Sequence, residues 1–514
     1  MQAQIHVRPA SIAICLVLLT LFLPACTSSS GTVPQAAATP ARVLAPTPIT
    51  PPQLTIAIPT AVSPTSSSTR LPLARPPTLL LADLKQQSEQ LRVRPVDPLS
   101  LADVPGYAPL DFGRHVATLS PDGRLMAVIL WPSSSSAGAT LHLIDLASWT
   151  DTTANLTPID EVNTLIFGPD GKVLYWVNPT QHDAAHNMPR AFELYRYDLG
   201  SQRLTTVTTL PPSFIPSELR LLRSGSSLAI YGLATDAENR AEEPPHVLVV
   251  DLVADHILTD VRLESIKAGQ MLMPTASGEE PHYQLYMPGT AWDLDHNLLY
   301  IVHADSDTIT VVDVATGRIV KQLDIHPQLS LGDRVWQALI PTAEAKGLPE
   351  TGRRALLSRD GTRLYIVGYR SEVTKLPTGE VDWQNRPLGL QVVATDDGSE
   401  RRHFDLPIGE IALSPDGQWL LLIGEGYAQD QSNGLYLLDA QRLEEPAHLK
   451  REGSYSLWGF SPDGQYAYIS SSFGNPGSYW TSWTVTLQVL DLKAHHIVTE
   501  RESKGYGEVI PLHT

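Results

Sequence analysis

Apolar and polar positions over residues 110–514 follow one recurring pattern. A short apolar run leads into a turn similar to Ser-Pro-Asp-Gly, and a second apolar run follows the turn. Proline presets the first backbone angle of such a turn, aspartate can hydrogen-bond to the backbone after it, and glycine accepts a positive φ. Each pair of runs is therefore predicted to be a tight β-hairpin.

This hairpin occurs in seven copies, which begin at Val116, Thr164, Leu219, Gly289, Arg354, Glu410 and Leu457. A third strand follows the hairpin, and in six copies it ends in an acid, namely Asp145, Asp198, Asp251, Asp313, Asp439 or Asp491. A fourth strand follows most of these. Long repeats of four antiparallel strands are typical of propellers, whereas a β-sandwich would not repeat one hairpin. We predict an all-β fold, a seven-bladed β-propeller of four-stranded antiparallel blades, over residues 110–514.

The segments on either side of this repeat are less regular. Residues 79–109 form a lead-in segment, in which Leu79–Leu91 are expected to form one short helix. At the other end, the segment from Gly507 is similar to the innermost strand that begins near Gly409. It is therefore either a strand that closes the ring or the start of an eighth blade.

The repeat resembles the YVTN-type and TolB-like propellers of bacteria, which are relatives of the WD-repeat fold. The closest stretch runs LLYIVHADSDTITVVDVATGRIVKQLDI from Leu298, and Ser-Pro-Asp-Gly itself occurs at Ser120, Ser414 and Ser461. The resemblance covers about 400 residues and implies the fold, because unrelated activities share this architecture.

The first 82 residues contain no acid, which separates them from the rest of the chain. An apolar run, Ile12–Leu23, is too short to span a bilayer and ends in Leu-Pro-Ala-Cys, which resembles a lipobox. We predict a lipoprotein signal peptide over residues 1–25 and lipidation of Cys26; the alternative is a plain secretory signal. Residues 26–78, rich in Pro, Ser and Thr, are expected to be a disordered tether. The protein would then be extracytoplasmic and anchored to the cell membrane or cell surface.

Charge and cysteine content narrow the partners. The net charge is −18, so the chain should repel phosphate backbones, and we expect no nucleic-acid partner. The two cysteines are Cys15 and Cys26, and the first lies in the signal. No intramolecular disulfide is expected in the mature chain, whose stability must come from core burial.

The long insertions are predicted to gather on one face of the ring. Antiparallel order places the loops after second and fourth strands together, opposite the Asp-Gly turns, and those loops are the long ones. Aromatic residues that commonly anchor interfaces occur in them: Trp336, Trp383, Tyr427, Phe473, Tyr479, Trp480 and Trp483. We expect this loop-rich face to bind a protein, peptide or glycan, although packing within the loops would explain some of these residues.

Carboxylates near the innermost strands are the candidates for a metal site. They are Asp111, Glu161, Glu218, Asp293, Glu350, Glu410 and Glu452, and as a ring at the mouth of the central channel they would suit Ca²⁺. Their spacing to the following turns is irregular, however, and no cofactor is predicted with any strength. His182 and His186 are best explained as residues of a solvated loop, and Asp293 with Asp295 as turn residues.

Enzyme signatures are missing from the sequence. It contains no GxSxG, no CxxCH and no repeated Asp-box, and it leaves no room for an α/β-hydrolase domain after the repeat. We therefore favour a binding or scaffold module. Two alternatives remain: a metal-dependent, lactonase-like hydrolase with its site at the channel mouth, and a structural component of an envelope complex.

Overall fold

The fold was analysed in a computed structural model of the whole chain. The structure describes residues 78–84, 91–113, 115–130, 138–156, 159, 162, 164–182, 189–236, 240–241, 243–273, 282–325, 351–375, 381–424, 434–450, 454–473, 484–504 and 507–512. Among these residues no helix is long and apolar enough to cross a membrane.

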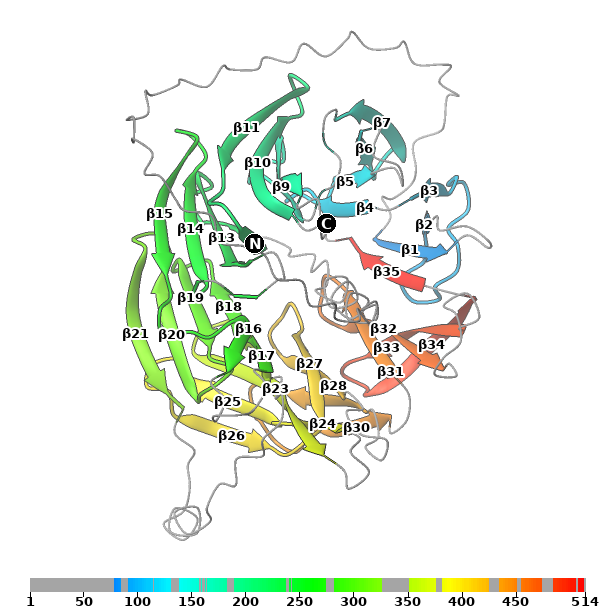
Figure 1. The fold of residues 1–514 in the computed structure, drawn as a ribbon. Helices are drawn as coiled ribbons and strands as arrows, with labels where there is room; N and C mark the ends of the chain where they lie inside the picture. Colours follow the sequence, from blue (N-terminus) through cyan, green and yellow to red (C-terminus); the bar gives the residue numbers. More distant parts are fainter. Residues whose placement is uncertain are drawn as a thin grey trace, which may run out of the picture. The chain divides into compact units, whose positions relative to one another are not determined.

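Eight β-sheets follow one another around a ring (Figure 1). The prediction of an all-β propeller is confirmed, but the prediction of seven blades is wrong. In chain order, blades one to four are β4–β7, β8–β11, β12–β15 and β18–β21, and blades five to seven are β22, β23, β25 and β26, then β27–β30 and β31–β34. Blade eight contains β35 and β1–β3.

The strands of blades one to four have these bounds: β4 His115–Leu119, β5 Leu125–Leu130, β6 Thr140–Asp145, β7 Thr150–Asn155, β8 Thr164–Phe167, β9 Val173–His182, β10 Pro189–Asp198, β11 Arg203–Thr209, β12 Phe214–Leu221, β13 Ser227–Ala234, β14 His246–Asp251, β15 His256–Arg262, β18 Gly289–Asp293, β19 Leu298–Val302, β20 Thr308–Asp313 and β21 Arg318–Asp324. Those of blades five to seven are β22 Thr351–Leu357, β23 Arg363–Lys375, β25 Leu390–Ala394, β26 Glu400–Phe404, β27 Ile408–Leu413, β28 Trp419–Gly424, β29 Leu435–Asp439, β30 Ala447–Lys450, β31 Ser454–Phe460, β32 Tyr466–Phe473, β33 Thr484–Asp491 and β34 His496–Lys504.

Blade eight joins the two ends of the folded chain. Its order is β35 (Gly507–Pro511), β1 (Leu79–Leu84), β2 (Leu91–Pro95) and β3 (Leu110–Phe112), with β35 innermost. The helix expected at the start of this segment is therefore wrong. Leu79, Leu80 and Leu81 are at most 1% exposed, because β1 is paired on both edges and covered on both faces. A continuous apolar run is typical of such a strand.

The Ser-Pro-Asp-Gly turns, and the Ser-Arg-Asp-Gly turn of blade five, owe their shape to their own side chains. In blade five, Ser358 Oγ donates to Asp360 Oδ1 at 2.6 Å and accepts the N–H of Arg363 at 2.9 Å. The same pair of bonds occurs at Ser120, Ser414 and Ser461. The glycine of each turn has a positive φ. The serine therefore replaces backbone partners that the tight turn cannot supply.

The acids at the ends of third strands cap the next turn. Asp251 accepts the N–H groups of Val253 and Ala254 at 2.8 and 2.9 Å, and these bonds hold the pKa of its carboxyl below the ordinary value. Corresponding bonds form in other blades. In blade eight Asp97 does the same for Leu99 and Ser100. Blade eight thus repeats the local chemistry of the others.

Apolar cores fill the spaces between neighbouring blades. The cluster between blades two and three includes Val177, Leu219 and Leu248, and the cluster between blades seven and eight includes Leu81 and Val489. Comparable clusters lie between blades one and two and between each successive pair of blades from three to seven. The fold is consequently stabilised by contacts between faces of successive sheets, without a single central core.

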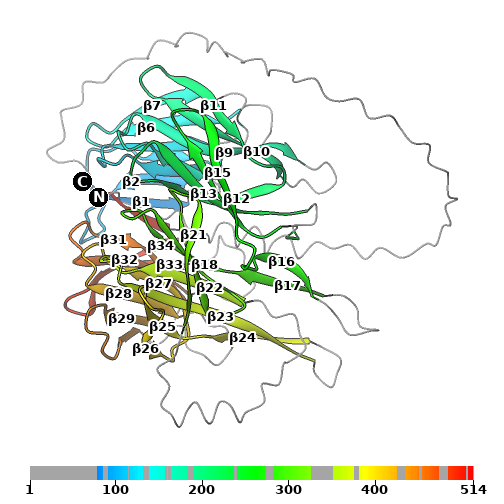
Figure 2. The ribbon, with the colours of Figure 1, turned by 90° about the vertical axis from the view of Figure 1, so that its left-hand side faces the viewer.

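Three further strands extend the sheet of blade five. They are β16 (Gly269–Met273), β17 (His282–Met287) and β24 (Val381–Pro387), in the order β16-β17-β22-β23, with β24 on the far part of β23. We call β16, β17, β22, β23 and β24 the rim sheet. Figure 2 shows β16, β17 and β24 extending toward the same side of the ring. That side is the loop-rich face, because these strands follow a fourth strand or a second strand.

Candidate functional site

The loop-rich face of blades three to five is built around three insertions. The first, residues 235–245, leaves β13 and is closed by an ion pair between Asp236 and Arg240. It is bridged to β16, where Ala241 N–H donates to the carbonyl of Gln270 at 2.9 Å. Gly269 has a φ of +76°, which favours glycine, and a Cβ there would lie 3.3 Å from Ala241 of the insertion.

The rim sheet connects blade five with a hairpin that precedes blade four in the chain. The hairpin of β16 and β17 arises between blades three and four, yet β17 pairs in parallel with β22 of blade five through Tyr286 and Thr351. Beneath it β18 and β22 lie close together, since a Cβ on Gly289 would meet backbone atoms of Arg354 and Ala355 at 3.0 Å. The insertion of blade three, the hairpin between blades three and four, and the added strand of blade five are thereby joined by β-pairing.

A short turn of blade four holds two ion pairs beneath the rim sheet. Lys267 Nζ lies 3.0 Å from Asp305 Oδ2 and 5.3 Å from the ring centroid of Tyr286. Arg353 Nη2 lies 2.8 Å from Asp307 Oδ1. Asp305 of the turn therefore pairs with Lys267, just before β16, and Asp307 pairs with Arg353 on β22. Together these ion pairs fix the rim sheet to blade four.

Burial and pairing set the charges of this region. The hydrogen bond to Asp305 raises the pKa of Lys267, and burial lowers the pKa of Arg353. Burial also lowers the pKa of His303, although Asp305 opposes this effect, and His303 Nε2 lies 2.8 Å from Thr310 Oγ1. Within each of the pairs Lys267–Asp305 and Arg353–Asp307, the positive and negative charges compensate each other. The region is therefore suited to positioning a rim rather than to acid–base chemistry.

One predicted carboxylate ties two innermost strands together. Glu218 on β12 accepts hydrogen bonds from Trp292 Nε1, at 2.7 Å, and from Thr290 Oγ1 of β18. Arg220 Nη2 lies 3.3 Å from the same carboxylate. Because its oxygens already have these partners, Glu218 joins blades three and four within the propeller.

The other predicted carboxylates lie in different places. Asp111 is on β3, the outermost strand of blade eight, where it pairs with Arg92 at 3.1 Å, so it is not on an innermost strand. Asp293 accepts the N–H of His296 inside its turn, and Glu410 is on β27. Glu161, Glu350 and Glu452 are outside the described residues. In the described part of the chain, no group of three or more His, Cys, Asp or Glu side chains is placed to hold a metal ion.

Most of the predicted aromatic anchors lie outside the described residues. Trp336, Tyr427, Tyr479, Trp480 and Trp483 are outside the described residues, as are Cys26, His186 and the predicted tether before residue 78. Trp383 lies on β24 and Phe473 ends β32, and for both only the backbone is described. Two anchor positions are thus on the strands that reach the loop-rich face.

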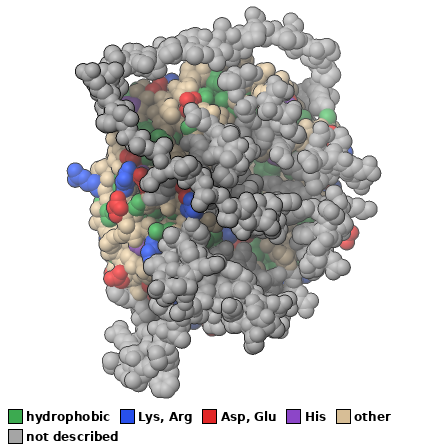
Figure 3. Space-filling view, in the orientation of Figure 1, with side chains coloured by type: hydrophobic (Ala, Val, Ile, Leu, Met, Phe, Trp, Pro, Cys, Tyr) green, Lys and Arg blue, Asp and Glu red, His purple; other side chains and the backbone are tan. Residues whose placement is uncertain are grey.

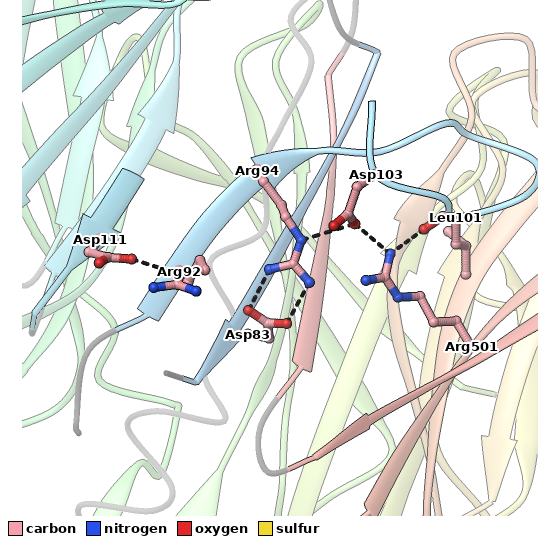
Figure 4. Close-up of polar contacts among 7 residues, drawn as sticks. All are labelled: Asp83, Arg92, Arg94, Leu101, Asp103, Asp111 and Arg501. Carbon is pink, nitrogen blue, oxygen red and sulfur yellow. Dashed lines mark hydrogen bonds and ion pairs between the residues drawn. The ribbon is translucent and has the colours of Figure 1, made fainter. Parts of the chain in front are cut away.

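Sequence reasoning missed a charge network in blade eight (Figure 4). Arg94 donates to both oxygens of Asp83, at 2.8 and 2.7 Å, and to Asp103 at 3.0 Å. Asp103 also binds Arg501 of blade seven at 2.8 Å. Burial alone would raise the pKa of Asp103, but the bonds from Arg501 and Arg94 lower it. The alternation Arg92-Val93-Arg94 on a short strand was the signal for this network.

A cleft lies on the face of the Asp-Gly turns, opposite the loop-rich face. It has a volume of about 400 Å³, lies between blades five and six, and is lined by residues including Arg363, Arg401 and Leu443. Arg363 Nη1 donates to the carbonyl of Ala440 at 2.9 Å, which joins the two blades. In the view of Figure 3, acidic and basic side chains are mixed over the described surface. The elaborated part of the described surface is therefore the rim sheet with its neighbouring insertions.

Comparison with known proteins adds information about the fold alone. No protein-family profile matches the chain, and no curated protein matches it. A dihydro-heme d1 dehydrogenase, NirN, solved in complex with DHE, is similar over 87% of this chain and 78% of its own, with 13% identity and a TM-score of 0.49. A eukaryotic initiation factor is similar over 85% and 98%, with 12% identity and a TM-score of 0.47.

TolB from Acinetobacter baumannii is similar over 75% of this chain and 82% of its own, with 12% identity and a TM-score of 0.31. At such identities the activities of these neighbours do not transfer to this chain, because one architecture supports unrelated functions. The chain is a β-propeller with a TolB among its structural neighbours.

Proposed function

We propose that this protein is a binding or scaffold module that engages a protein, peptide or glycan through its loop-rich face. The observation that carries the proposal is the rim sheet, because it joins insertions of blades three and five and of the link between blades three and four on one face. Rigid β-structure that projects from a scaffold reduces the ordering cost of binding. The self-paired charges beneath it favour a structural and binding role over catalysis.

The proposal includes an anchor and a location. The Leu-Pro-Ala-Cys segment supports lipidation of Cys26, and the Pro-rich residues 26–78 would then act as the tether outside the cytoplasm. The folded blades begin at Leu79, directly after that segment. Cys26→Ser should move the protein from the membrane fraction to the soluble extracytoplasmic fraction; retention in the membrane would contradict the anchor.

Photo-crosslinking tests the loop-rich face directly. A photoreactive amino acid is placed at Met287, which is 37% exposed at the end of β17, and, as the matched control, at Val253, which is 79% exposed on the turn between β14 and β15. Irradiation of intact cells followed by electrophoresis should give discrete adducts at Met287 and none at Val253.

Each outcome bears on the proposal. Adducts of equal yield at both positions would mean that contact is not specific to the loop-rich face, and the absence of adducts at Met287 would contradict binding through the rim. Both variants should retain the melting temperature of the unmodified protein, because neither side chain belongs to an apolar cluster between blades.

A further inference from the structure

A buried histidine stands between two carboxylates at the foot of the blade-three insertion. His246 is the first residue of β14 and is 3% exposed. Its Nδ1 lies 2.8 Å from Asp260 Oδ1 on β15, and its Nε2 lies 3.3 Å from Glu243 Oε2 on the insertion. Phe214 of β12 covers the ring, with the two ring centroids 6.0 Å apart.

The two contacts differ in quality. A neutral imidazole has one N–H and one lone pair, and the short contact with Asp260 assigns the N–H to Nδ1. Nε2 then turns a lone pair toward a carboxylate, and it is buried without a hydrogen-bond partner. Such an arrangement costs free energy, whereas a proton on Nε2 converts it into a charge-assisted hydrogen bond.

The remaining groups around the ring do not remove this mismatch. Arg262 on β15 lies 3.0 Å from Glu243 Oε2 and keeps that carboxylate facing the histidine. On β13 the residue paired with His246 is Gly232, and on β12 it is Phe214 that meets the ring. Within the described residues, Asp260, Glu243 and Arg262 are the charged groups that these contacts bring to His246.

Glu243 is part of a segment that reaches the rim sheet. The same insertion includes Ala241, which donates its N–H to Gln270 of β16, and Arg240, which is bridged to Gln270. We propose that His246 is a proton-dependent latch, which holds Glu243, and with it Arg240 and Ala241, against blade three when both ring nitrogens carry protons. Imidazole is the side chain that ordinarily titrates closest to neutral pH. The latch would close on acidification and loosen as the pH rises.

Hydrogen–deuterium exchange on the full chain tests the latch at about pH 5.5 and about pH 8, with rates normalised to the intrinsic exchange at each pH. For the backbone amides of Arg240, Ala241, Glu243 and His246 in the unmodified protein, we expect about tenfold higher protection at the lower pH. Glu243→Gln removes the charge that faces Nε2, and His246→Asn keeps a polar atom near Asp260 but has none at Nε2. Both variants should lose this gain.

The matched control is Glu264→Gln, an exposed carboxylate of the same blade, which should keep the gain. A profile in Glu243→Gln equal to that of the unmodified protein would overturn the latch, as would a gain spread evenly over all blades. The side chain of Glu243 is 40% exposed, so Glu243→Gln should fold. It therefore tests the latch even if His246→Asn fails to fold. The exchange experiment tests the latch without any ligand, so its outcome does not depend on the proposed function. Only an effect of the latch on binding would rest on the proposed function.

Discussion

At the scale of single residues, the propeller depends on side chains that replace backbone hydrogen-bond partners in tight turns. Ser358 is 7% exposed, and its hydroxyl both donates to Asp360 and accepts from Arg363. The hydrogen bond from Ser358 is the main cause that lowers the pKa of Asp360. The turn motif therefore acts as a small, self-contained hydrogen-bond network.

Ser358→Ala should lower the free energy of unfolding by about 1 kcal/mol, because the variant leaves buried groups of the turn without a partner. The control is Ser306→Ala, at an exposed position of another turn, which should change it by less than about 0.5 kcal/mol. Denaturant unfolding at neutral pH measures both. Equal effects of the two variants would contradict the role assigned to the buried hydroxyl.

The pH dependence of this contribution has a definite sign. The folded-state pKa of Asp360 is lowered, so its contribution is present above the ordinary pKa of aspartate and is lost as the pH falls through the folded pKa. The stability difference between the protein and Ser358→Ala should therefore shrink below about pH 4.

The sequence predicted these turns because their chemistry is local. The acids at the ends of third strands were predicted from the sequence only by position. Their role in capping the following turn, as at Asp251, was not predicted. The Glu218 contact with Trp292 could not be predicted, because it joins residues of different blades. His246 gave no signal either, since its two carboxylates are brought together only by the pairing of β14 with β15 and by the course of the insertion.

At the scale of elements, blade eight explains why the number of blades was underestimated. Its first two strands, β35 and β1, lie at opposite ends of the chain, so no Ser-Pro-Asp-Gly turn connects them. A signal was present in residues 91–97, LRVRPVD, which match the third strands that end in aspartate. The expected helix failed because pairing and burial decide the conformation of a leucine-rich segment more strongly than propensity does.

Leu81→Ala tests whether β1 is part of the propeller. Leu81 is 1% exposed in the cluster between blades seven and eight, so we expect a loss of about 2–5 kcal/mol. Leu99 lies in the same N-terminal segment but is 45% exposed, and Leu99→Ala should cost less than about 0.5 kcal/mol. If Leu81→Ala cost no more than Leu99→Ala, residues 79–112 would be a mere lead-in segment.

Outer strands share a device that the sequence did not reveal. In blades two to seven, the pairing between the third and fourth strands contains a register shift. The extra residue is Leu258 in β15, Val320 in β21 and Val498 in β34, which are 51%, 53% and 40% exposed. A bulge bends an edge strand and discourages pairing with another chain. These exposed apolar residues are therefore a consequence of edge protection.

At the scale of the whole molecule, the ring is closed by strand pairing in blade eight and by side-chain contacts from blade eight to its two neighbours. Arg501 of blade seven binds Asp103 of blade eight, and Trp149 of blade one donates its indole N–H to the carbonyl of Ala108 at 2.7 Å. The predicted gathering of insertions on one face fits the rim sheet. Its pairing with blade five could not be predicted, because β17 and β22 are far apart in the sequence.

Truncation tests the closure as a property of the whole ring. A chain that begins at Pro72, within the compact unit Pro72–Thr514, should melt like the full chain. A chain that begins at His115 lacks β1, β2 and β3 and should lose its cooperative transition, because β35 and the last apolar cluster lose their partners. Circular dichroism melts and size-exclusion chromatography measure both.

A synthetic peptide of residues 78–113, added to the shorter chain, should restore the transition. If the chain that begins at His115 melted like the full chain on its own, seven blades would be sufficient and the role of blade eight would be refuted.

The pairing of β1 with β35 also sets the order of events during biosynthesis. Leu79 pairs with Pro511, so about 430 residues must be made between the two partners, and contacts of such separation form late. The ring therefore stays open until β35 has emerged from the ribosome. A translation product that stops before β35 leaves β1 without its innermost partner. Pairing of β35 with β1 thus makes closure of the ring one of the last steps of folding.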